Sequence, residues 1–173
     1  KTMGYELAEQ MGWKLPDAIL YPTGGGTGLI GMWKAFQEME TMGFVGPGRP
    51  RMYAIQPEGC APIVKAFAEG LESAPFWENA QTLAQGLRVP KALGDFLMLR
   101  AMRESHGAGA TVSEEEIIQG VKEASAREGL FVCPEGGACV AALRKLKASG
   151  HLSPDDTVLE IGPGLGALTR PLV

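Results

Sequence analysis

Short apolar runs alternate along this chain with longer stretches in which apolar residues recur at helical spacing. The apolar run 17–21 lies between two prolines and is typical of a buried parallel strand. The segments 51–55, 110–112 and 157–161 are further predicted strands. Between 29 and 42 the apolar positions follow a helical period, and Gly43 ends the pattern. We expect this helix to face the core through Trp33, Phe36 and Met39.

Further helices are predicted before and after these strands. Ser113 and Glu116 have the spacing of a capping box, which predicts a helix from there to about Glu128 with Gly129 as its C-terminal cap. The segment 130–132 is a short strand or an extended stretch, and 73–90 is a predicted loop with some helical turns. Helical patterns also occupy 2–11, 61–68, 92–104 and 137–148. Alternating strands and helices predict an α/β fold, with a mainly parallel sheet and flanking helices in three layers.

Composition narrows the class of protein. The 173 residues suit one domain, with 45% apolar and 21% charged residues. A net charge of −4 argues against a nucleic-acid partner, which requires a basic face. No apolar run reaches the roughly 18 residues of a membrane span. Three scattered cysteines, without a disulfide or zinc pattern, indicate reduced thiols in a cytoplasmic protein.

One glycine loop carries candidate chemistry. Thr23-Gly24-Gly25-Gly26-Thr27-Gly28 connects a predicted strand to a predicted helix. Glycines let backbone amides approach an anion, and the helix N-terminus adds a favourable dipole. The lysine of a P-loop and the glycine spacing of a dinucleotide fingerprint are both missing. Taken alone, this loop indicates either a phosphate site or only a tight turn.

The residues around this loop resemble those of threonine synthases, pyridoxal-phosphate enzymes of the tryptophan-synthase β fold type. The resemblance covers residues 1–156. It is carried by Lys1–Gln10, Leu15–Asp17, Pro22–Phe36, Gln56–Ile63, Gly86–Pro90, Gly94–Leu97 and Pro134–Ala138. It implies the large-domain part of that fold, with pyridoxal phosphate as cofactor. It also implies a small-molecule substrate, O-phosphohomoserine, which the family converts with water to threonine and phosphate.

The resemblance assigns roles to particular residues. It implies that Gly24, Gly25, Gly26, Thr27 and Gly28 bind the cofactor phosphate through backbone amides. The family's Schiff-base lysine lies upstream of the matching segment, so we expect no catalytic residue here and an incomplete, non-catalytic fragment. The stretch with Gln56, Cys60 and Pro62 lacks the acidic residues with which some relatives bind a cation, so no metal site is expected. Glu135 lies in a turn that the fold could place near the cofactor cleft.

The last 17 residues differ from the family pattern. Residues 157–169 resemble motif I of S-adenosylmethionine-dependent rRNA adenine dimethyltransferases, in which the acid at the Glu160 position lies beside the cofactor. We therefore divide the chain into a partial threonine synthase-like domain, 1–156, and an atypical last strand and turn, 157–173. Two alternatives remain: a non-catalytic phosphate-binding module, and a chimera that binds S-adenosylmethionine. A homo-oligomer is a further expectation, because exposed sheet edges favour pairing with another chain.

Overall fold

Four parallel strands form a single sheet in the computed structural model, which describes residues 1–161. The strand order is β3-β2-β1-β4. The strands are β1 (Ala18–Pro22), β2 (Arg51–Pro57), β3 (Gly109–Val112) and β4 (Val158–Glu160). Every neighbouring pair is parallel, and Leu20 of β1 aligns with Tyr53 on one side and Glu160 on the other. The predicted parallel sheet is therefore confirmed. The predicted glycine turn after β4 lies outside the described residues.

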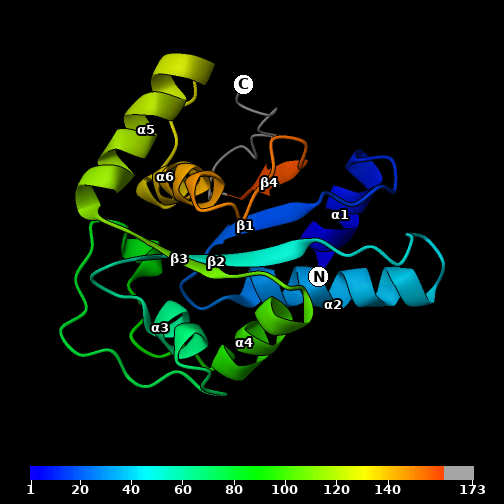
Figure 1. The fold of residues 1–173 in the computed structure, drawn as a ribbon, viewed down its shortest axis with the longest axis horizontal. Coiled ribbons are helices and arrows are strands. Elements are labelled where there is room, and N and C mark those ends of the chain that lie inside the picture. Colours follow the sequence, from blue (N-terminus) through cyan, green and yellow to red (C-terminus); the bar gives the residue numbers. More distant parts are fainter. Residues whose placement is uncertain (162–173) are drawn as a thin grey trace.

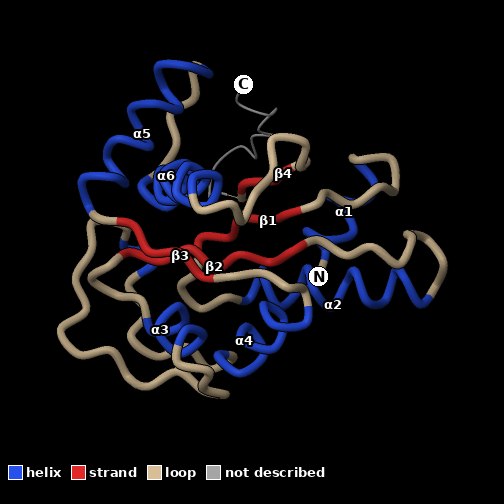
Figure 2. Tube along the Cα trace, in the orientation of Figure 1, coloured by secondary structure: helices blue, strands red, loops and turns tan. Residues whose placement is uncertain are grey.

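Helices cover both faces of this sheet and give the expected three layers (Figure 1). On one face lie α2, α3 and α4, with α1 packed against α2; on the other lies α6, with α5 beside it (Figure 2). The helices are α1 (Thr2–Gln10), α2 (Thr27–Thr41), α3 (Pro62–Ala68), α4 (Asp95–Glu104), α5 (Glu114–Glu128) and α6 (Pro134–Ala148), with a short 3₁₀ turn, η1, at Gln85–Leu87. Within residues 1–161, no helix is long and apolar enough to cross a membrane.

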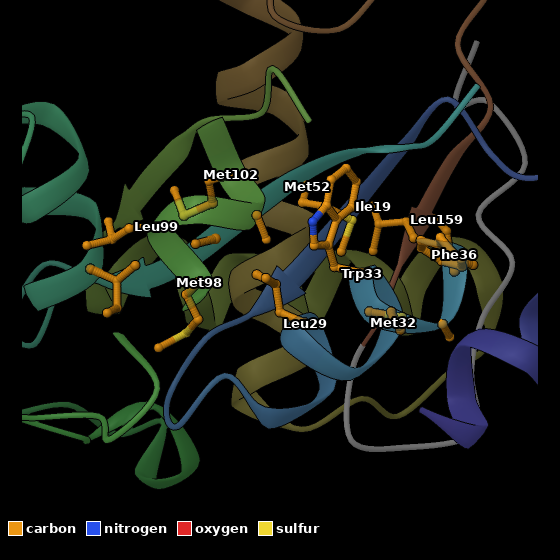
Figure 3. Close-up of a cluster of buried hydrophobic side chains, with 14 of the residues drawn as sticks. Ile19, Leu29, Met32, Trp33, Phe36, Met52, Met98, Leu99, Met102 and Leu159 are labelled. Atoms are coloured by element: carbon orange, nitrogen blue, oxygen red, sulfur yellow. The ribbon is translucent and has the colours of Figure 1, made fainter. Parts of the chain in front are cut away.

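Successive side chains along each strand point to opposite faces of the sheet, and this divides the core into two clusters. Ile19, Met52 and Leu159 point toward α2 and α4, where they meet the buried apolar side of both helices (Figure 3). The predicted core residues Trp33, Phe36 and Met39 belong to this cluster and are confirmed. The intervening strand residues, such as Leu20 and Tyr53, join a second cluster beneath α6. Because side chains of a strand alternate between faces, a sheet buried on both sides needs nearly continuous apolar strands.

The boundaries of α5 follow the predicted caps. The Ser113 hydroxyl accepts from the amide of Glu116 at 3.2 Å, and the Glu116 carboxylate accepts from the amide of Ser113 at 2.8 Å. Gly129 ends the helix in the left-handed region at φ 67°. Beyond it, 130–132 does not form a strand.

The fourth helix begins three residues later than its apolar pattern indicates. The carboxylate of Asp95 accepts from the Ser73 hydroxyl at 2.8 Å and from the Ala74 amide at 2.9 Å, and it pairs with Lys91 at 2.7 Å. These contacts anchor α4 at Asp95 and turn Met98, Leu99, Ala101 and Met102 into the core. Leu93 consequently precedes the helix and is 99% exposed. The sequence alone could not reveal this anchor, because two of its partners, Ser73 and Ala74, lie about twenty positions upstream.

Candidate functional site

The glycine loop lies where the strand order of the sheet reverses. From β1 the chain moves outward through β2 to β3, and it then returns to place β4 on the other side of β1. In open α/β sheets, ligands bind outside the carboxyl ends of the strands at such a switch point. The loop 23–28 follows the carboxyl end of β1, and Glu160 ends β4 beside it. The topology therefore places both at the expected ligand crevice.

Buried hydrogen bonds fix the start of the loop. Thr23 is fully buried; its amide donates to Ile55 O at 2.8 Å and its hydroxyl to Tyr21 O at 2.8 Å. Its carbonyl accepts from Gln56 Nε2 at 3.0 Å. The other side-chain atom of Gln56, Oε1, accepts from the first amides of α3. The loop thus leaves β1 from a rigid position that β2 and α3 share.

The remainder of the loop presents backbone amides that donate to no backbone carbonyl of residues 1–161, and the amide of Gly28 bonds the Tyr21 hydroxyl instead. The first amide of α2 to find a carbonyl is that of Ile30, which donates to Gly26 O at 3.0 Å. Gly26 caps the helix at φ 71° without a side-chain bond. Within residues 1–161, no backbone carbonyl accepts from the amides of 24–29. Such unpaired amides at a helix N-terminus form a site that favours an anion.

The shape of the loop leaves room for that anion on one side. Gly24 and Gly26 are buried, whereas Gly25 and Thr27 are exposed. A Cβ added at Gly24 or Gly26 would collide with neighbouring atoms, but one added at Gly25 would meet no described atom within 4 Å. At Gly28 the obstacle is the Tyr21 hydroxyl, and burial raises the pKa of that tyrosine. A phosphate group fits the open side, since amides, the Thr27 hydroxyl and the helix dipole all favour negative charge there.

A second segment covers the loop. Residues 83–90, here termed the covering segment, contain η1 and place the Gly86 carbonyl against Gly24. Glu135, in the first turn of α6, accepts from the Gly86 amide through Oε1 at 2.8 Å. Burial by itself would raise the pKa of Glu135, but hydrogen bonds from its own amide, the Cys133 thiol and Gly86 hold it below the usual value. The sequence predicted a loop here without indicating what it contacts.

Glu160 lies on the α6 side of the same switch point. It is only 6% exposed, and burial raises its pKa to about 7. Its Oε1 atom has no hydrogen-bond partner within residues 1–161 and lies near Gly136, in the first turn of α6. A carboxyl group in this environment holds its proton near neutral pH. Within the same residues, no group of three or more metal-ligating side chains is arranged to hold an ion.

The comparisons with known proteins agree with this geometry. Residues 1–164 match the model of the pyridoxal-phosphate dependent enzyme family, and the chain belongs to that family. Within it, the chain is similar to threonine synthases: it is 37% identical over 164 residues to that of Methanosarcina acetivorans and 31% identical over 166 residues to that of Methanocaldococcus jannaschii. The matches cover 95% and 96% of this chain but 40% and 41% of the relatives.

Solved structures share the fold at lower identity. A serine racemase from maize matches with a TM-score of 0.69 and 22% identity, covering 95% of this chain and 48% of that chain. A fungal L-serine ammonia-lyase from Rhizomucor miehei matches with a TM-score of 0.73 and 21% identity, covering 96% and 50%. These similarities establish the fold, in agreement with the architecture expected from the sequence.

Proposed function

We propose that the loop 24–28 binds the phosphate of pyridoxal phosphate in a threonine synthase-like enzyme that acts on O-phosphohomoserine. The observation that carries this proposal is the row of amides before and at the start of α2 that donate to no described backbone carbonyl, open to one side at Gly25. The similarity to threonine synthases supports the substrate. Bound pyridoxal phosphate supplies an electron sink that stabilises negative charge on a substrate carbon.

In this proposal, the residues of this chain bind the phosphate of the cofactor and orient it. Gly24, Gly25 and Gly26 donate amides to the phosphate, Thr27 adds a hydroxyl, and Gly28 allows the helix to start against Tyr21. Fixing the phosphate anchors one end of the cofactor, because a dianion held by several amides has little translational freedom.

We propose further that residues 1–173 provide this binding part alone and that the lysine for covalent attachment of the cofactor lies outside them. Self-association and a cytoplasmic location belong to the same proposal. The location rests on three cysteines, Cys60, Cys133 and Cys139, that form no disulfide.

The proposed absence of the attachment lysine can be tested directly. Borohydride reduction in the presence of pyridoxal phosphate, followed by peptide mapping, should label no single lysine. A specific adduct on one lysine would contradict the proposed division.

Substitution at Gly25 tests the phosphate site. Gly25→Val places a side chain in the open space beside the amides, where no described atom opposes it. We expect the melting temperature to stay near that of the wild type, while calorimetry with pyridoxal phosphate and with inorganic phosphate shows at least about tenfold weaker binding. Unchanged affinity for both ligands would exclude the loop as the site. Binding of phosphate alone, without preference for the pyridoxal group, would favour a simple phosphate-binding module.

A further inference from the structure

Glu135 reaches from α6 to a backbone amide that lies 49 positions earlier in the chain. Its Oε1 atom accepts from Gly86 N at 2.8 Å. A Cβ at Gly86 would lie 2.9 Å from the same oxygen, so a larger residue there would push the Glu135 carboxylate out of this position. A carboxylate that accepts from a backbone amide forms a charge-assisted hydrogen bond, which is stronger and more directional than a neutral one. Glu135 therefore fixes where Gly86 lies relative to α6.

Gly86 in turn contacts the phosphate loop. Its carbonyl oxygen occupies the space that a Cβ of Gly24 would need, and the Cγ2 atom of Val89 would lie 3.1 Å from that Cβ. Backbone thus packs directly on backbone, with no flexible side chain between the two segments. A displacement of Gly86 would be transmitted to Gly24, because there is no space between these close-packed groups into which either could move.

Each end of the covering segment forms a hydrogen bond with another part of the chain. Leu83 N donates to Glu114 Oε2 of α5 at 2.9 Å, and Trp77 N donates to Pro90 O at 3.0 Å. Inside the segment, Leu87 and Arg88 donate to carbonyls of the segment itself. Other side chains from outside the segment bond its backbone nearer its ends, since Ala84 N donates to Thr82 Oγ1 and Val89 N to the Cys60 thiol; Glu135 is the described side chain that accepts from Gly86 itself.

We propose that Glu135 is a positioning residue for the phosphate loop, acting through the Gly86 backbone on Gly24. This inference rests on the proposed function. In it, Glu135 does not touch the cofactor; it sets the distance between the covering segment and the loop amides. Removing its carboxylate leaves the Gly86 amide without its acceptor, so that Gly86 shifts against Gly24 and the amides of the loop lose the geometry that a phosphate requires.

The test compares two ligands that differ by the phosphate group. We expect Glu135→Ala to bind pyridoxal phosphate about tenfold more weakly, the size expected for loss of one charge-assisted hydrogen bond, and pyridoxal within about twofold of the wild type. Glu135→Gln keeps an acceptor oxygen and should restore most of the difference. The matched control is Glu115→Ala, which removes another first-turn glutamate, exposed on α5, whose side chain bonds Ser113. It should bind both ligands as the wild type does.

Hydrogen exchange supplies a readout that does not depend on a ligand. In Glu135→Ala, the amides of Gly86, Leu87 and Arg88, which are hydrogen-bonded in the wild type, should exchange faster, while those of α2 beyond its first turn keep their rates. If Glu135→Ala fails to fold, Glu135→Asp shortens the reach but keeps the charge, and it should give the same pattern.

Failure of this inference can be distinguished from failure of the proposed function. Normal phosphate selectivity in Glu135→Ala, in a protein whose Gly25→Val variant has lost it, would overturn the positioning role alone. An equal loss of affinity for pyridoxal and pyridoxal phosphate would also overturn it. A wild-type protein without preference for the phosphorylated ligand would overturn both.

Discussion

Two glutamates at the switch point of the sheet occupy opposite electrostatic environments. Glu135 gains hydrogen bonds from amides and a thiol, which hold its pKa below the usual value. Glu160 is buried without such bonds from residues 1–161, and its pKa rises to about 7. Burial disfavours the charged form of a carboxyl group, and donors to the carboxylate favour it. At neutral pH the first is therefore an anchoring anion, and the second is close to half protonated.

The environment of Glu160 predicts a pH dependence of stability. Folding raises its pKa from 4.5 to about 7. The favourable term that the protonated carboxyl group adds to the free energy of unfolding is therefore complete below pH 4.5 and is lost as the pH rises through 7. At about 1.4 kcal/mol for each pH unit between these two pKa values, the contribution is about 3 kcal/mol. Urea unfolding between pH 5 and 8 should show this decline in the free energy of unfolding. Glu160→Gln should flatten it and exceed the wild type in stability at pH 8; parallel curves would contradict the assignment.

At the scale of elements, the start of α5 connects local sequence to the site. The capping box at Ser113 begins the helix directly after β3. This placement puts Glu114 where its carboxylate accepts from Leu83 N at the beginning of the covering segment. A signal readable from four consecutive residues thus helps to position a segment about thirty residues upstream.

Removal of the cap should be measurable. Ser113→Ala loses the hydroxyl that accepts from the Glu116 amide, and we expect about 1 kcal/mol lower stability in urea unfolding. Ser113→Asp retains an acceptor and should remain near the wild type. Equal stability of all three proteins would mean that other contacts determine where α5 begins.

At the scale of the whole molecule, the sheet ends in two edge strands, β3 and β4. Apolar side chains are also exposed around the start of α4: Leu93 precedes the helix, and Phe96 and Leu97 lie in its first turn. Their exposure is 99%, 48% and 36%. Exposed apolar side chains that are close together along the chain are consistent with the proposal of self-association.

Light scattering over a range of concentrations tests that proposal. We expect a mass above that of one chain, decreasing to one chain in the double variant Leu93→Ser, Phe96→Ser. Phe131→Ser is the control, because Phe131 is 93% exposed but lies between α5 and α6. The same mass, that of a single chain, in all three proteins would exclude self-association through this surface.

The sequence by itself determined the alternation of strands and helices, the parallel sheet, the cap of α5 and the family. Each depends on residues close together along the chain: apolar periodicity, a capping pair, or a collinear match such as that around Gly24–Gly28. The sequence also singled out Glu135 as a residue near the crevice, but it could not name a partner.

Only the tertiary structure decided which distant segments meet. The order of the strands placed β4 beside β1, and that neighbour buried Glu160 against α6. Folding also brought Gly86 between Gly24 and Glu135, and it moved the start of α4 to Asp95. These contacts join residues separated by about twenty to one hundred and forty positions. No local period encodes them, because their free energy depends on the packed arrangement of the whole sheet and its helices.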